Sequence, residues 1–267
     1  MSDSPLKLFS RLLGNPAHPR IIVAHGLCGS GRNWLSVGEA IAQAGFCVEL
    51  LDLRDHGQSP RSTVLDYPRL AEDVAAHIAS LGNIGVIYMG HSMGGKLGMR
   101  LVTHHKDIKI NGLCVVDSAP RGYQLSFVPA LRACAALDLA QVKTRADADR
   151  LLSPGIPDDQ FRHFLQTNLV RTDAGGFRWI CNWDIILRDF QNIGDNPIAE
   201  NDTWPGPSLF IVSDRSGYFK TDIDTPAVQN HFPQNKIITV AAGHNVHIEA
   251  PKEFLSNFIP WATSLAR

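Results

Sequence analysis

Residues 90–94 have the sequence Gly-His-Ser-Met-Gly, a spacing that can present Ser92 as a nucleophile. A serine hydroxyl is a poor nucleophile until the backbone presents it, a base takes its proton and donors await the oxyanion. The two glycines of the motif permit the sharp strand-to-helix turn on which such a serine sits. Because the motif alone is frequent by chance, its context matters: the apolar run 84–89 before it predicts a buried parallel strand, and residues 96–102 after it have helical character. We therefore predict that Ser92 is a catalytic nucleophile.

A histidine near the end of the chain can act as the base. His244 lies in Gly-His-Asn-Val-His, and its place fits the chain order nucleophile, acid, histidine that accompanies this type of turn. The glycine before it suits a tight loop that delivers the imidazole, which favours His244 over its competitor His247. The spacing of these two histidines could indicate a metal, but there is no third ligand nearby and no His-Glu-x-x-His helix. We therefore expect neither a metal nor a cofactor.

Two backbone N–H groups are the expected oxyanion donors. One usually comes from the loop that precedes the first major helix, and the other comes from the residue after the nucleophile. In this sequence the loop is His25-Gly26-Leu27, so the predicted donors are the amides of Leu27 and Met93.

The acid of the predicted triad has two candidates. Asp117 ends the strand expected at 110–117, and Asp214 directly follows the strand expected at 208–213. Both lie between Ser92 and His244 in the chain. Either carboxylate could hold the imidazole tautomer and stabilise the imidazolium that forms during attack.

These residues need a sheet to position them, and the chain predicts one. Apolar strand patterns alternate with helical stretches, which is typical of a mostly parallel, twisted sheet with helices on both faces. Besides the strands already named, we predict strands at 20–26, 46–53 and 236–240, and helices at 34–44, 67–81 and 252–264. The residues of a catalytic site would then meet at the carboxyl ends of the strands.

From about residue 118 to about residue 201 the pattern changes. Strand signals vanish, and short helical stretches are expected at 128–137, 158–168 and 183–190. We interpret residues 118–201 as a helical cap inserted before the last two strands, with 1–117 and 202–267 forming the core. Several aromatic residues of the cap could line an acyl pocket or pack inside the cap itself: Tyr123, Phe127, Phe161, Phe164, Phe177 and Trp179.

The composition limits the possible partners. The 267 residues carry a formal net charge of −1, so nucleic acid is not an expected partner. No apolar run reaches the roughly 18 residues that a transmembrane helix needs. The five cysteines form no close pairs, and the first residues lack the pattern of an export signal, so we expect a cytoplasmic protein with reduced thiols. The oligomeric state is left open.

Four motifs together resemble the α/β-hydrolase superfamily. They are the segments at 25–30, at 51–60 with the sequence Leu-Asp-Leu-Arg-Asp-His-Gly-Gln-Ser-Pro, at 90–96 and at 243–251. Nearly the whole chain is similar to the small bacterial cytosolic esterases that are related to a mitochondrial hydrolase of higher organisms, including Val-Asp-Ser-Ala-Pro at 116–120. The resemblance implies an α/β-hydrolase fold. In the segment 51–60, Arg54 and His56 are expected to build the turn.

The resemblance also bears on the acid and on the reaction. Most members of the superfamily carry the acid at a position that corresponds to Ser216 here, whereas the esterase branch uses one after the preceding strand, which corresponds to Asp117. This favours Asp117 over Asp214. We therefore expect a serine carboxylesterase that hydrolyses small acyl esters through an acyl-serine intermediate. The alternatives are a thioesterase, a C–C bond hydrolase or a cofactor-free perhydrolase on the same triad, and a catalytically silent hydrolase-fold receptor.

Overall fold

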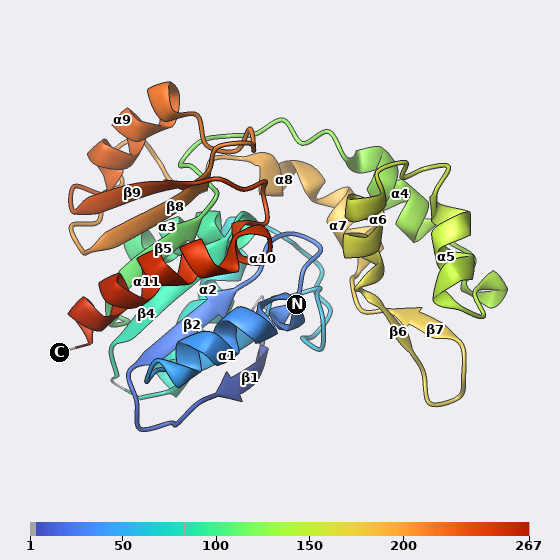
Figure 1. The fold of residues 1–267 in the computed structure, drawn as a ribbon, viewed down its shortest axis with the longest axis horizontal. Helices are drawn as coiled ribbons and strands as arrows, with labels where there is room; N and C mark the ends of the chain where they lie inside the picture. The colour runs from blue at the N-terminus through green and yellow to red at the C-terminus, as the bar shows by residue number, and fades with distance from the viewer. Residues whose placement is uncertain (1–3, 83, 267) are drawn as a thin grey trace.

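A seven-stranded sheet forms the centre of the protein. The computed structural model describes residues 4–82 and 84–266 (Figure 1). The strand order is β1-β3-β2-β4-β5-β8-β9, and all neighbouring strands are parallel except β1, which is antiparallel to β3. The strands are β1 (Phe9–Leu13), β2 (Arg20–Ala24), β3 (Cys47–Asp52), β4 (Val86–His91), β5 (Ile110–Val116), β8 (Ser208–Ser213) and β9 (Asn235–Val240). The predicted mostly parallel sheet is confirmed.

Helices cover both faces of this sheet, because successive side chains of its strands point to opposite sides. In β2, Ile22 packs into one hydrophobic cluster and Ile21 into another, and both are fully buried. The first cluster includes residues of α2 (Tyr67–Ser80), α3 (Met93–His104) and α9 (Thr221–His231). The second includes residues of α1 (Leu35–Gln43) and α11 (Pro251–Leu265). The two clusters hold the carboxyl ends of the central strands in fixed positions.

The segment 118–201, called the inserted segment below, leaves the sheet after β5 and returns at β8. It contains α4 (Val128–Ala135), the short 3-10 helix η2 (Leu139–Gln141), α5 (Arg145–Leu152), α6 (Asp159–Gln166), α7 (Trp183–Arg188) and α8 (Phe190–Gly194). Figure 1 shows these helices as a lobe beside the sheet, with α8 nearest the sheet and α5 farthest from it. Hydrogen bonds join the lobe to the core, among them Leu65 N–H to Asp189 Oδ2 at 2.7 Å.

The structure departs from the sequence prediction in several elements. Strand signals were expected to vanish in the inserted segment, but it contains a hairpin of β6 (Leu169–Arg171) and β7 (Phe177–Trp179). The edge strand β1 and helix α9 were not predicted. The helix expected at 34–44 begins as the 3-10 turn η1 (Gly31–Trp34) before α1. None of these departures moves the strands that carry the predicted site.

Among the described residues, none of the helices has the length and apolar character that a membrane span requires.

Candidate active site

Ser92 stands on the turn between β4 and α3. Its backbone has φ 51° and ψ −113°, and its N–H donates to Val116 O at 2.9 Å. A Cβ atom on Gly90 would lie 2.0 Å from Gly94 O, and one on Gly94 would lie 2.5 Å from Ala24 O. Neither position has space for a side chain, so both motif glycines are required for the close approach of β4, α3 and β2. The predicted strand–turn–helix context of Ser92 is thus present.

The structure brings Asp117 and His244 together. His244 Nδ1 lies 2.6 Å from Asp117 Oδ2, and the Asp117 side chain is completely buried. Asp117 also accepts hydrogen bonds from Ser216 Oγ at 2.5 Å and from Ser213 N–H at 2.9 Å. Burial alone would raise the pKa of Asp117, but these hydrogen bonds and the His244 charge hold it below its usual value. The carboxylate is therefore kept ionised beside the imidazole.

Ser216, at the position that corresponds to the acid in most of the resembled superfamily, donates a hydrogen bond to Asp117. The other acid candidate, Asp214, points elsewhere. Its side chain is 46% exposed, lies 3.6 Å from the guanidinium of Arg215, and accepts a hydrogen bond from Ala242 N–H at 3.1 Å. Its contacts are those of a residue that holds a surface turn.

His247, the competing histidine, is also placed away from the carboxylates. Its ring stacks on Trp34 with centroids 3.8 Å apart and an interplanar angle of 2°. Burial is the main reason that its pKa lies well below that of an ordinary histidine. Neither ring nitrogen has a hydrogen-bond partner among the described residues.

Two residues that sequence reasoning missed hold the His244 ring. Tyr218 stacks on it with centroids 4.1 Å apart, and the His91 ring lies 4.6 Å from it. His91 Nε2 donates to the backbone carbonyl of His244 at 2.9 Å. Burial, with a smaller contribution from His244, lowers the His91 pKa to about 3, so His91 is neutral at physiological pH. His91 precedes Ser92 in the motif, but nothing in its spacing signals this contact.

The two predicted oxyanion donors, Leu27 and Met93, both line the cavity that contains Ser92. Within residues 4–82 and 84–266, neither of their N–H groups has a protein acceptor. Met93 is the first residue of α3, where helix N–H groups point outward and the helix dipole favours negative charge. Both groups are thus free to receive a developing oxyanion.

Two buried histidines shape the loop around Leu27. His25 Nδ1 donates to Gly26 O at 2.8 Å, and its Nε2 accepts from Leu53 N–H at 3.0 Å. His56 Nδ1 donates to Arg54 O at 2.8 Å, and its Nε2 accepts from Cys28 N–H at 3.1 Å. These partners assign one neutral tautomer to each ring. Burial lowers the pKa of His25 to about 4 and that of His56 to about 3.

The inserted segment adds a further hydrogen bond to this loop. Asn168, which is 1% exposed, donates from Nδ2 to Cys28 O at 2.6 Å across 140 sequence positions. Its Oδ1 in turn accepts from Cys181 Sγ at 3.1 Å. The backbone N–H and carbonyl of Cys28 are therefore both hydrogen-bonded, and these bonds hold a residue whose φ of 60° is unusual for a non-glycine.

Backbone strain gathers at this site. The described non-glycine residues with positive φ are Cys28, Asp55, Ser92 and Asp117, and three of these four belong to the site. Strained backbone persists where the surroundings enforce it and is often found at functional positions. Here tight glycine contacts enforce it at Ser92, and the buried hydrogen bonds described above enforce it at Asp117 and Cys28.

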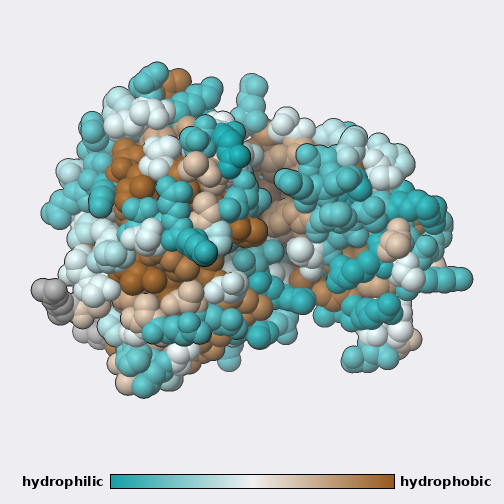
Figure 2. Space-filling model, viewed as in Figure 1, coloured by the Kyte–Doolittle hydropathy of each residue, from teal (hydrophilic) through white to brown (hydrophobic). Residues whose placement is uncertain are grey.

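Ser92 and His244 face one cavity between the core and the inserted segment. Figure 2 shows the surface hollowed between these two parts, with apolar residues visible inside. Four aromatic residues of the inserted segment line it, namely Tyr123, Phe127, Phe161 and Phe164. Phe177 and Trp179, also considered for the pocket, are not part of its lining: Phe177 packs into a separate small cluster, and Trp179 lies edge-on against Trp183.

A buried lysine, which sequence reasoning also missed, links the nucleophile helix to the inserted segment. Lys96 is 1% exposed and donates from Nζ to Asp195 O at 2.6 Å and to Gly194 O at 3.1 Å. Its ammonium lies 4.1 Å from the centre of the Tyr123 ring. Burial lowers the Lys96 pKa to about 7. The contact holds the end of α8 against α3 at the edge of the cavity.

Comparisons with known proteins agree with this architecture. A family model described as the alpha/beta hydrolase fold matches residues 19–251. The Mus musculus protein named sn-1-specific diacylglycerol lipase ABHD11 is 34% identical over 260 residues, covering 94% of this chain and 83% of that protein. Ethanol acetyltransferase 1 of Wickerhamomyces ciferrii is 26% identical over 94% of this chain and 70% of its own length. A solved structure described as a marine microorganism esterase matches with a TM-score of 0.89 and 35% identity, covering 96% of this chain and 99% of that one.

Proposed function

This chain belongs to the α/β-hydrolase family, and on that premise we propose that it is a carboxylic ester hydrolase with the triad Ser92, His244 and Asp117. The observation that carries the proposal is the 2.6 Å contact of a completely buried Asp117 with His244, in a cavity that Ser92 also lines. A catalytically silent receptor has no need of a buried carboxylate held against this imidazole. The esterase and lipase names of its relatives support the same reaction class.

The proposed reaction runs through an acyl-serine. His244 Nε2 takes the proton from Ser92 Oγ as that oxygen attacks the carbonyl carbon of the ester. The carbonyl oxygen becomes an oxyanion, which the N–H groups of Leu27 and Met93 stabilise. As the C–O bond breaks, His244 gives its proton to the departing alcohol. Water, activated by the same imidazole, then releases the acid, while Asp117 stabilises the imidazolium at both stages.

We further propose that the inserted segment acts as a cap that sets the acyl preference. Residues 118–201 would form this cap, and residues 1–117 and 202–267 the core. The support is its position over the carboxyl ends of the strands and the apolar side chains that it contributes to the cavity, among them Phe127 and Phe161.

A fluorophosphonate probe tests the proposal directly. We expect the probe to label Ser92 in the native protein and the label to be lost in Ser92→Ala. Wild type should hydrolyse p-nitrophenyl esters of short acyl chains, and an acyl-CoA thioester assayed beside them separates esterase from thioesterase activity. Ethanol added to the assay tests the transfer reaction named for the acetyltransferase relative. A native protein that takes no label and hydrolyses none of these compounds would show that the receptor alternative is correct.

A further inference from the structure

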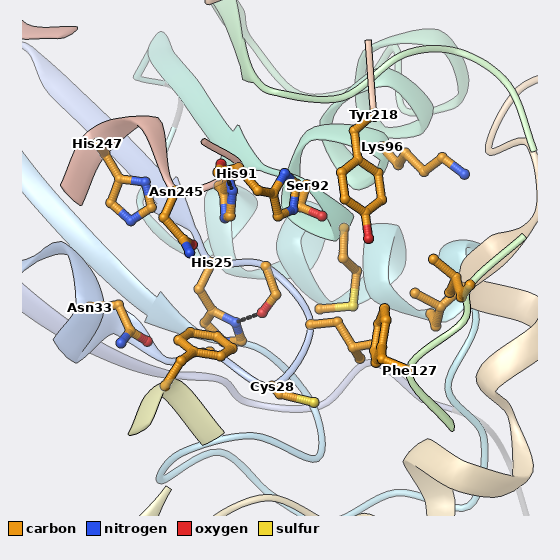
Figure 3. A pocket seen from close by; sticks show the side chains of 18 of the residues that line it. His25, Cys28, Asn33, His91, Ser92, Lys96, Phe127, Tyr218, Asn245 and His247 are labelled. Atoms are coloured by element: carbon orange, nitrogen blue, oxygen red, sulfur yellow. Dashed lines mark hydrogen bonds between the residues drawn. The ribbon is translucent and has the colours of Figure 1, made fainter. Parts of the chain in front are cut away.

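The cavity around Ser92 has two sides of different chemistry. Phe127 and Lys96 lie on one side of Ser92 in Figure 3, whereas Asn33, Asn245 and His247 lie on the other. The first side is continued by apolar side chains of the inserted segment and its neighbours, including Leu125, Phe161 and Ile193. An acyl chain fits the apolar side, which leaves the amide-bearing side for another part of the substrate.

The polar side has hydrogen-bonding groups that no protein group uses. In the described part of the chain, the Asn245 carboxamide makes no hydrogen bond. Asn33 Oδ1 accepts from Ser30 N–H at 2.8 Å, but the Asn33 Nδ2 group has no acceptor there. Both His247 ring nitrogens and Trp34 Nε1 are buried without a partner among the described residues. A buried polar group left unpaired is costly, so such a cluster is expected to meet water or polar groups of a ligand.

The chemistry of the reaction indicates which part of the substrate lies here. The departing oxygen must reach His244 to receive its proton, and Asn245 directly follows His244 in the chain. The alcohol portion of an ester therefore extends along the loop that carries Asn245 and His247. Carboxamides and a neutral imidazole both donate and accept hydrogen bonds, as hydroxyl groups do.

We propose that Asn33, Asn245 and His247 form a subsite for hydroxyl groups on the alcohol portion of the substrate. The preferred substrates are then small acyl esters of hydroxylated alcohols, of the glycerol or glycol type, and not esters of simple alkyl alcohols. Water occupies the subsite when the alcohol carries no hydroxyl, and the substrate hydroxyl replaces that water. This inference rests on the proposed ester hydrolase function.

Two esters of the same shape test the subsite. In 2-hydroxyethyl butyrate and propyl butyrate, a terminal hydroxyl replaces a methyl group, so the ratio of their kcat/KM values reports on that hydroxyl alone. One net hydrogen bond between neutral groups corresponds to about a two- to tenfold change in this ratio. We expect Asn245→Leu and His247→Phe each to lower the ratio by such a factor. His247→Phe keeps a flat ring for the stack on Trp34.

A variant on the apolar side is the matched control. Phe127→Leu should change rates for both esters together and leave the ratio as in wild type. A ratio that stays at the wild-type value in both Asn245→Leu and His247→Phe would overturn the subsite, while esterase activity of the wild type would leave the proposed function standing. A ratio that falls equally in Phe127→Leu would also overturn it. Failure of the wild type to hydrolyse either ester, or any p-nitrophenyl ester, would instead remove the proposed function and the subsite with it.

Discussion

Replacing Asp117 by asparagine should remove most of the activity while the fold stays intact. The asparagine Oδ1 can still accept from Ser213 N–H, a bond of 2.9 Å in the wild type. The new Nδ2 group replaces the oxygen that accepts from His244 and Ser216. The Ser216 hydroxyl can rotate and accept from Nδ2. The imidazole can avoid a clash of two donors only by moving its proton to Nε2, where it no longer takes the proton of Ser92.

The size of this effect follows from the burial of the pair. The same exchange in a serine protease lowers turnover about ten-thousandfold, equivalent to about 5.5 kcal/mol of activation free energy. Because the Asp117 side chain is 0% and the His244 side chain 27% exposed, little water can compensate, and we expect a loss in kcat of about a thousandfold to ten-thousandfold. The assay is hydrolysis of p-nitrophenyl butyrate, with circular dichroism to verify folding.

Asp214→Asn is the matched control for this exchange. Asp214 is 46% exposed and contacts Arg215 and Ala242, so kcat should stay within about threefold of wild type, as for most exposed substitutions. A larger loss in Asp214→Asn than in Asp117→Asn would refute the assignment of the acid. Equal losses in the two variants would refute the argument from the tautomer.

Three further outcomes are expected. Asn168→Leu removes the hydrogen bond to Cys28 O, so kcat should fall about tenfold while KM stays unchanged. This loss is smaller than the roughly hundredfold or greater cost of removing a whole oxyanion donor. Thr167→Ala, at the exposed neighbouring position, should match wild type, and a change in KM alone for Asn168→Leu would contradict the prediction. The kcat/KM of the wild type should fall as pH decreases below about 7, because a base must be neutral to act. The low pKa values of Asp117, His25, His56 and His91 exclude them from this change, whereas Lys96, with a pKa of about 7, gains charge in the same range. Lys96→Met should therefore keep the acidic fall in kcat/KM, and its loss in that variant would contradict the assignment to the base. Phe127→Ala should change the ratio of kcat/KM between short and long acyl chains by tens of fold, because one methylene contributes about 1–3 kcal/mol in such a pocket. Phe177→Leu should leave this ratio unchanged. Equal changes in the two variants would show that the acyl pocket lies elsewhere.

The central sheet and the nucleophile turn were predictable because both depend on local patterns. A buried parallel strand is a continuous apolar run, as in β4 and β8, and every residue of these two strands is buried. The glycines beside Ser92 are required by backbone contacts within a few residues of the turn or with the adjacent strand. The position of Asp117 at the end of β5, next to β4, follows from the same strand order.

The elements that were missed lack such a local signal. Strand β1 has no fully buried residue, and it contains Arg11 and a 43% exposed Leu12, so its side chains do not alternate clearly. The strands β6 and β7 are three residues each, shorter than the runs in which a period of two can be recognised. The sequence could not decide whether Phe177 and Trp179 line the cavity or pack inside the inserted segment. Their position depends on how the β6–β7 hairpin folds onto the neighbouring helices.

The contact between Asn168 and Cys28 shows why site residues of the inserted segment lie beyond the reach of sequence patterns. The 140 positions between these residues contain three of the seven strands of the sheet and more than half of the inserted segment, so no spacing relates them. Yet the bond holds the carbonyl of Cys28, the residue that follows Leu27, and the Leu27 N–H is a proposed oxyanion donor. His56 of the core holds the N–H of Cys28 and Asn168 of the inserted segment holds its carbonyl, so both parts of the protein fix this residue in its strained conformation. In the proposed mechanism, the inserted segment therefore helps to position the reacting carbonyl as well as shaping the cavity.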